Sequence, residues 1–172
     1  MAFSETVRRR FADTVQAHLD DAYRLARRLV GASEAEDVVQ DAALKALRAL
    51  ETHAVANPRA WFLAIVRNAA FDALAKRGPI AAPSFDWECA EREIMDPNAD
   101  IEAAMIAKQD GAAVLAALDA LPPPFREALT LRDVNDLSYR EIAQATNAQI
   151  GTVMSRLARA RSMLAKALGS WP

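Results

Sequence analysis

From Ile142 to its C-terminus, the chain carries four basic side chains and no acidic one: Arg156, Arg159, Arg161 and Lys166. The protein as a whole is nearly neutral, with 21 Lys and Arg against 23 Asp and Glu, so this positive charge is concentrated locally. Basic side chains bind DNA phosphates, and arginine can also donate two hydrogen bonds to guanine in the major groove. The pattern therefore indicates a DNA-binding surface, while a solvated basic face of a helical bundle is the alternative.

Two short helices separated by a tight turn are predicted to present this surface. The first helix is predicted to start at Ser138, an N-cap with Glu141 at the capping-box position. Asn147 suits the left-handed residue of the turn, and the second helix runs over residues 150–168. The side chains expected to face inward are Ile142, Ala143, Ile150, Val153, Leu157, Ala160 and Leu164.

This arrangement is a helix-turn-helix, whose second helix enters the major groove of DNA. The outward side of that helix is polar and basic, so its side chains are expected to contact bases and phosphates. The candidates for DNA contact are Thr152, Ser155, Arg156, Arg159 and Lys166.

A candidate protein-binding surface lies on a helix predicted over residues 33–50, with Ser33 as N-cap and Glu36 completing a capping box. One side of this helix is apolar, and Leu44 lies on the opposite, polar side. An apolar side chain ringed by polar ones has the composition of a binding hot spot, although an isolated exposed leucine is also common. The side expected to be buried comprises Ala35, Val38, Val39, Ala42, Ala46 and Leu50, and the polar face comprises Asp37, Gln40, Asp41, Leu44 and Arg48.

The rest of the chain also favours helices, because only 5 glycines occur and β-branched residues do not alternate with polar ones. Helices are predicted over residues 4–30, closed by Gly31, and over residues 57–76, starting at Asn57-Pro58. Two more are predicted over residues 110–121 and 125–134. The apolar stripe of the first helix comprises Phe11, Val15, Leu19, Ala22, Ala26 and Leu29.

Residues 79–108 separate the two helical parts and contain two basic and seven acidic side chains together with three prolines. An acidic stretch punctuated by proline favours a linker, while a solvated surface loop of a single domain is the alternative. We predict an all-α fold of two small helical domains, residues 1–78 and 109–172, joined by an acidic flexible linker over residues 79–108. Trp87 and Cys89 in this linker have no role that the sequence indicates.

Several classes of protein are not expected. Neither a glycine-rich nucleotide loop nor a nucleophile–base motif occurs, which argues against an enzyme. One cysteine and two isolated histidines, His18 and His53, are too few for a metal site, and no cofactor is expected. No apolar run approaches the roughly 20 residues that span a bilayer, and the N-terminus lacks the apolar core of a signal peptide. We therefore expect a cytoplasmic protein without membrane insertion.

The motifs LPPPFREAL, LSYREIA and GTVMSRLARAR, within residues 117–164, resemble region 4 of the extracytoplasmic-function (ECF) sigma factors of RNA polymerase. In that family this module reads the −35 promoter element. Members usually carry glycine where Asn147 stands and a basic residue where Met154 stands. The second difference removes one DNA contact that the resemblance would otherwise imply.

The segment AEDVVQDAALKAL, residues 35–47, is similar to region 2.2 of the same family. There, an acidic helix docks on the clamp helices of the polymerase β′ subunit, and Asp37, Gln40 and Asp41 match that motif. The aromatic residues often found later in the motif are replaced here by Ala43 and Leu47.

The segment NPRAWFLAIVRNAAFDALAKR, residues 57–77, is similar to regions 2.3 and 2.4, which melt and read the −10 element. The resemblance places Asn68 near the base that is extruded from the duplex. Trp61 and Phe62 could stack on bases, but aromatic residues at helical spacing more often belong to the core, which we favour for Trp61. Phosphate contacts are expected from Arg59, Arg67, Lys76 and Arg77.

The resemblance covers about residues 10–168 and implies an alternative sigma factor. Such a protein binds core RNA polymerase through its β′ and β subunits, directs it to stress or envelope-response promoters, and is controlled by an anti-sigma factor. The acidic linker would then pass near the polymerase active site, with a simple solvated tether as the alternative.

Three other functions are alternatives to this interpretation. One is a helix-turn-helix repressor or activator that binds DNA without polymerase. Another is a sigma-like decoy for an anti-sigma factor, against which the retained Arg156 and Arg159 argue. The third is a small helical enzyme, but no set of residues in the sequence suggests a catalytic site.

Overall fold

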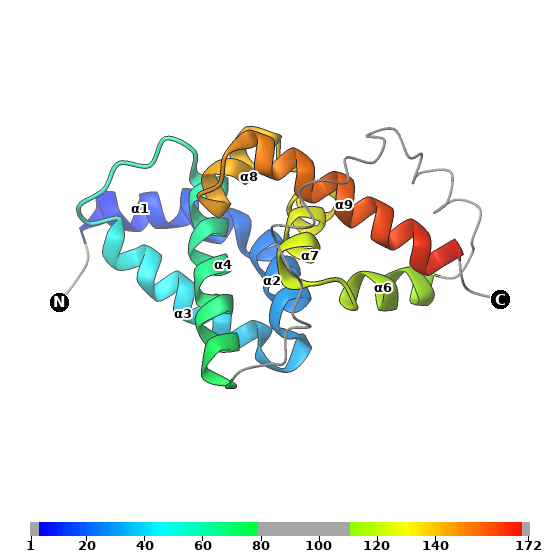
Figure 1. The fold of residues 1–172 in the computed structure, drawn as a ribbon. Coiled ribbons are helices and arrows are strands. Elements are labelled where there is room, and N and C mark those ends of the chain that lie inside the picture. The colour runs from blue at the N-terminus through cyan, green and yellow to red at the C-terminus, as the bar shows by residue number, and fades with distance from the viewer. Residues whose placement is uncertain (1–3, 79–110, 170–172) are drawn as a thin grey trace.

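The computed structural model describes residues 4–78 and 111–169, and within these ranges it consists of helices and their connections, with no strand (Figure 1). The predicted all-α fold is confirmed for the described residues. The N-terminal half contains α1 (Glu5–Thr14), the 3-10 turn η1 (Gln16–His18), α2 (Leu19–Val30), α3 (Ala32–Ala49) and α4 (Pro58–Lys76). The C-terminal half contains α6 (Gly111–Asp119), α7 (Pro123–Leu129), the π-helical turn η3 (Thr130–Val134), α8 (Tyr139–Thr146) and α9 (Ile150–Gly169).

The first helix is interrupted, so the prediction of one helix over residues 4–30 is wrong. The chain leaves regular α-helical geometry at Val15, forms η1 and re-enters a helix at Leu19. A 3-10 helix has three residues per turn, so the apolar stripe changes phase across it. Leu19 is exposed, contrary to prediction, whereas the predicted Ala22, Ala26 and Leu29 are buried together with Leu25.

The predicted N-cap of α4 is correct, but that of α3 is not. α3 begins directly after Gly31, whose φ of 92° is a left-handed conformation that favours glycine. Gly31 is the N-cap, so the predicted cap at Ser33 is wrong. The start of α4 is confirmed, because Asn57 caps it and its side-chain oxygen accepts a hydrogen bond from the backbone N–H of Ala60 at 3.1 Å.

The predicted helix-turn-helix is present in α8 and α9. Ser138 and Glu141 form the expected capping box, with the Ser138 N–H donating to the Glu141 carboxylate at 2.8 Å. Asn147 has φ 50° and ψ 43°, the left-handed conformation predicted for the turn. The sequence between the two helices therefore sets the direction in which α9 leaves α8.

Small side chains hold α2, α3 and α4 together. Ala22 and Ala26 of α2, Ala42 and Ala46 of α3, and Ala70 of α4 are fully buried. The distance between packed helices depends on the side chains at the contact, so alanines allow a close approach. The predicted buried side of α3 is confirmed, since Ala35, Val38, Ala42, Ala46 and Leu50 are buried and Val39 is half-buried.

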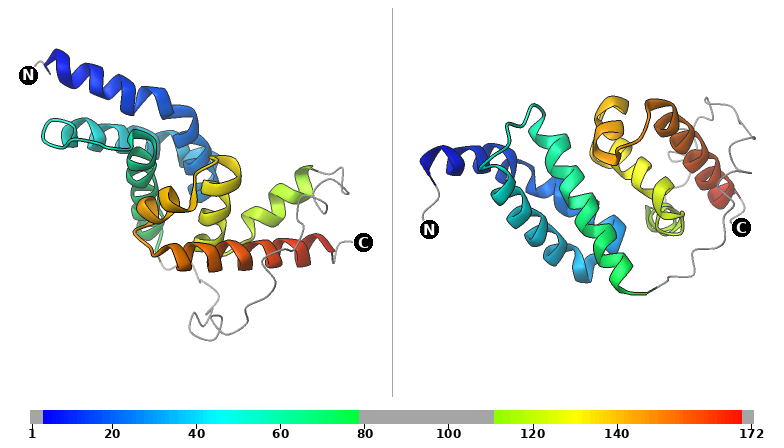
Figure 2. Two further views of the ribbon diagram at one scale, coloured as in Figure 1. Left: turned by 90° about the horizontal axis from the view of Figure 1, so that it is seen from above. Right: turned by 60° about the vertical axis from the view of Figure 1, so that its left-hand side comes forward.

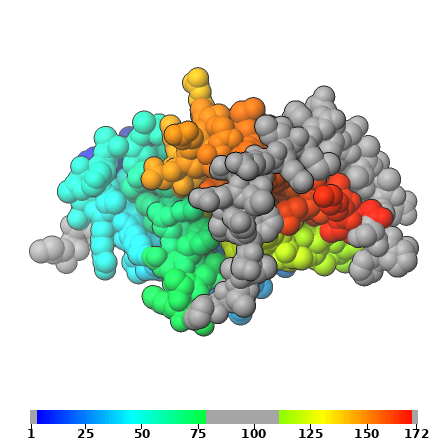
Figure 3. Space-filling model, viewed as in Figure 1, coloured from blue at the N-terminus to red at the C-terminus, as the bar shows by residue number. Residues whose placement is uncertain are grey.

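The two halves of the chain pack on each other. α8 lies against α4, and α7 with η3 lies against α2, as the two views of Figure 2 also show. In the space-filling view of Figure 3, the α8 region rests directly on α4. Polar contacts also cross the boundary, among them Asn57 Nδ2 to Glu141 Oε1 at 2.9 Å, Arg28 Nη1 to Asp119 Oδ1 at 3.1 Å, and Asn135 Nδ2 to the Asp21 carbonyl at 2.9 Å.

The predicted linker over residues 79–108, with Trp87 and Cys89, lies outside the described residues. The proposed domain boundaries at residues 78 and 109 therefore stay a prediction.

Replacing Asn147 tests the turn of the helix-turn-helix. Alanine bears the steric cost of a left-handed conformation, about 1 kcal/mol, whereas glycine adopts it without strain. We expect Asn147→Ala to lower the free energy of unfolding by about 1 kcal/mol, and Asn147→Gly not to lower it, as measured by urea denaturation. Equal stability of the two variants would contradict this role of the turn.

Candidate nucleic-acid and protein interfaces

The polar face of α3 is exposed to solvent. Asp37, Gln40, Asp41, Leu44 and Arg48 are all exposed, and Leu44 has 56% of its surface exposed. Because the alanine side of the same helix is buried, these five residues lie together on one outward surface, as the sequence predicted.

A groove between α3 and α4 adjoins this face. Lys45 Nζ bridges it, lying 2.8 Å from Asp41 Oδ2 on its own helix and 3.6 Å from Asp72 Oδ2 on α4. The hydrogen bond to Asp41 raises the pKa of the Lys45 ammonium group. Sequence analysis missed Lys45 and Asp72, because their proximity depends on how α3 packs on α4. The groove is lined by Glu34, Asp37, Val38, Asp41, Lys45, Ala69, Asp72, Ala73, Ala75, Lys76 and Arg77.

Two of the four arginines and lysines predicted to contact −10 DNA, Arg59 and Arg67, contact the C-terminal half. Arg59 forms an ion pair with Asp21 at 2.7 Å and donates a hydrogen bond to the backbone carbonyl of Asn135. Arg67 forms an ion pair with Glu127 of α7, and its guanidinium lies 4.7 Å from the centre of the Phe71 ring. Both contacts with the C-terminal half engage guanidinium donors that the predicted phosphate contacts would need.

Of the other predicted −10 residues, Asn68 lies beside Arg67 in α4, Lys76 is the last residue of this helix and Arg77 is its C-cap. Asn68 and Lys76 are exposed. Arg77 donates to the Val30 carbonyl at 2.8 Å and pairs with Glu34 at 2.6 Å. Of the two aromatic residues, Phe62 is fully buried and Trp61 is partly buried against the core, which agrees with the core interpretation.

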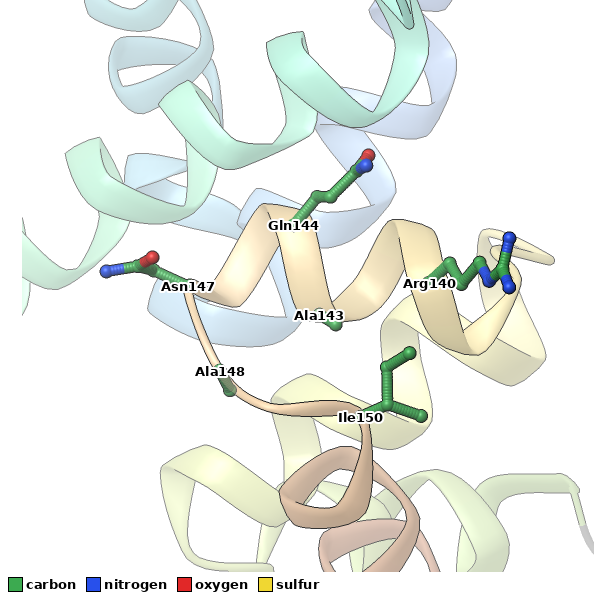
Figure 4. A pocket seen from close by; sticks show the side chains of 6 residues that line it. All are labelled: Arg140, Ala143, Gln144, Asn147, Ala148 and Ile150. Atoms are coloured by element: carbon green, nitrogen blue, oxygen red, sulfur yellow. The ribbon is translucent and has the colours of Figure 1, made fainter.

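The inward face of the helix-turn-helix is largely as predicted. Ile142, Val153, Leu157, Ala160 and Leu164 are buried, and Ala143 is half-buried. Ile150 is the exception, because it is 43% exposed at the very start of α9. It borders a shallow hollow at the turn, shown in Figure 4, whose other lining residues are Arg140, Ala143, Gln144, Asn147 and Ala148.

The predicted −35 residues are distributed along α9. Ser155 is exposed, and its hydroxyl donates to the Thr152 carbonyl at 3.0 Å. Arg159 is half-buried and Lys166 is exposed. Arg156 is half-buried and close enough to Glu127 for its charge to act on that carboxylate.

Glu127 is a buried charge that the sequence did not indicate. Only 1% of its surface is exposed. Burial raises the pKa of its carboxyl group, against the hydrogen bond and charge of Arg67 and the charge of Arg156, which lower it. No local pattern could have singled it out, since its partner Arg67 is 60 residues away in the sequence.

Among the described residues, none of the helices combines the length and the apolar composition needed to cross a membrane.

Two family descriptions match the chain in order. Residues 14–80 match Sigma-70 region 2, and residues 111–164 match Sigma-70, region 4. The first includes the exposed face of α3 and all of α4, and the second includes the helix-turn-helix.

Three relatives are similar over most of the chain. The ECF RNA polymerase sigma factor SigE of Mycolicibacterium smegmatis is 35% identical over 153 residues, which are 88% of this chain and 59% of that protein. The ECF RNA polymerase sigma-E factor of Escherichia coli is 33% identical, with 81% of this chain and 76% of that protein covered. The RNA polymerase sigma-H factor of Pseudomonas aeruginosa is 37% identical, with 80% and 74% covered.

Two solved structures resemble the fold. The sigma factor RpoE of Bartonella quintana, in complex with the anti-sigma factor NepR, has a TM-score of 0.66 and 26% identity, covering 94% of this chain and 99% of that one. CnrH, in complex with the cytosolic domain of CnrY, has a TM-score of 0.63, 23% identity, and coverage of 94% and 89%. With both sigma regions matched in order and the Escherichia coli relative 33% identical over 76% of its length, the chain belongs to the ECF family of RNA polymerase sigma factors.

Proposed function

We propose that the protein acts as an alternative sigma factor, which binds core RNA polymerase through the exposed face of α3 and promoter DNA through α4 and α9. The observation that carries this proposal is the separation of these surfaces. An apolar residue ringed by polar ones lies outward on α3, while the basic residues of the helix-turn-helix lie on a different part of the chain. A helix-turn-helix regulator that binds DNA unaided has no need of the first surface.

Such a protein directs initiation without catalysing a reaction itself, and it acts in the cytoplasm, where polymerase and DNA are found. Region 2 would melt and bind the −10 element, and region 4 would read the −35 element. One of the two solved structures described above contains a sigma factor in complex with an anti-sigma factor. By analogy, we expect an anti-sigma factor to control this protein in a stress or envelope response.

Reconstitution with core polymerase tests the proposal. The purified protein is expected to co-elute with the core enzyme in size-exclusion chromatography, and the complex is expected to start transcripts from specific promoters in a run-off assay. Specific binding of the free protein to duplex promoter DNA, unchanged by core polymerase, would instead support a conventional helix-turn-helix regulator.

Leu44→Ala tests the polymerase-binding surface. Truncating an exposed apolar anchor at a hot spot is expected to weaken the affinity for core polymerase by about tenfold, measured by fluorescence anisotropy. The double variant Asp37→Ala/Gln40→Ala is expected to weaken it as well. Leu115→Ala is the matched control, because Leu115 of α6 is another leucine with 46% of its surface exposed. If Leu44→Ala and Leu115→Ala bind polymerase equally well, the surface is misassigned.

Arg159→Ala tests the promoter-binding surface. Loss of one arginine contact to DNA typically costs 1 to 3 kcal/mol, so we expect run-off transcription to fall by about tenfold or more at limiting DNA. Affinity for core polymerase should stay unchanged. Arg27→Ala, which removes an exposed arginine from α2, is the matched control. A transcript yield equal to that of the wild type would exclude Arg159 from the −35 contact.

A further inference from the structure

The start of α9 presents apolar side chains to solvent. Ile150 and Met154 lie one helical turn apart and are 43% and 53% exposed. Gly151 and Ser155 beside them are exposed as well, whereas Val153 faces the core. The outward surface of these first turns is therefore uncharged and partly apolar, in contrast to the basic residues farther along the helix.

The start of α9, before Arg156, carries no arginine that could donate hydrogen bonds to guanine. No charged residue occurs between Glu141 and Arg156. In the major groove, the apolar group on a base edge is the C5 methyl of thymine. Arg140, exposed on α8, and Arg159, farther along α9, lie on either side in the sequence and suit phosphates next to the base contact.

We propose that Met154, supported by Ile150, contacts a thymine methyl group in the −35 element; this inference rests on the proposed promoter-binding function. The methionine side chain is unbranched and polarisable, so it adapts to a methyl group without a fixed geometry. Ile150, one turn earlier, would shield that contact from water. The difference from the basic residue usual in the family would then change the base preference and not merely delete a contact.

Replacing single −35 thymines with deoxyuridine removes only the methyl group and tests the contact directly. For the wild-type protein in complex with core polymerase, one such replacement is expected to weaken promoter binding by about fourfold, the value for burying one methyl group. With Met154→Ala, the same replacement is expected to have no further effect. Leu115→Ala is the control and should respond to deoxyuridine as the wild type does.

Two results would overturn the inference while leaving the proposed function intact. One is wild-type binding that no deoxyuridine replacement changes. The other is a Met154→Ala variant with normal DNA binding but weaker assembly with core polymerase, which would assign the apolar surface to a protein contact. If the wild-type complex binds no promoter specifically, the proposed function fails together with the inference.

Discussion

Close packing of alanine-lined helix faces is the constraint on which the N-terminal half depends. Most of the stability of a helix in a folded protein comes from packing its apolar face against a neighbour, and not from the helix alone. Ala42 and Ala46 commit one side of α3 to the contact with α2 and α4. The opposite side, with Leu44 among polar residues, has no place in the core and is left available for a partner.

α4 is under a stricter constraint because it has neighbours on two sides. Phe62, Leu63 and Val66 are buried, while Arg59 and Arg67 reach residues of the C-terminal half. Two of the side chains predicted to bind promoter DNA, Arg59 and Arg67, therefore also bind the other half of the protein. An arginine donates its hydrogen bonds to one set of acceptors at a time, so contact between the halves and contact with DNA are alternatives.

α9 also has one side that packs in the core and another that is exposed. Val153, Leu157 and Leu164 hold it to the rest of the C-terminal half. The left-handed conformation of Asn147 ends α8, and α9 begins three residues later at Ile150. Ile150, expected inside, is exposed at the first residue of α9. Base recognition by this helix is then expected to combine apolar contact at its start with basic contacts farther along.

The sequence by itself determined the features that depend on neighbouring residues: the helical class, the caps at Asn57 and Ser138, the left-handed Asn147, and the inside and outside of α3. These follow from backbone hydrogen bonding and helical periodicity, which act over a few residues. Tertiary structure alone decided the exposure of Leu19 and the pairing of Arg67 with Glu127. The first depends on a change of helical phase, and the second joins residues 60 positions apart, so neither leaves a local signature that sequence reasoning can detect.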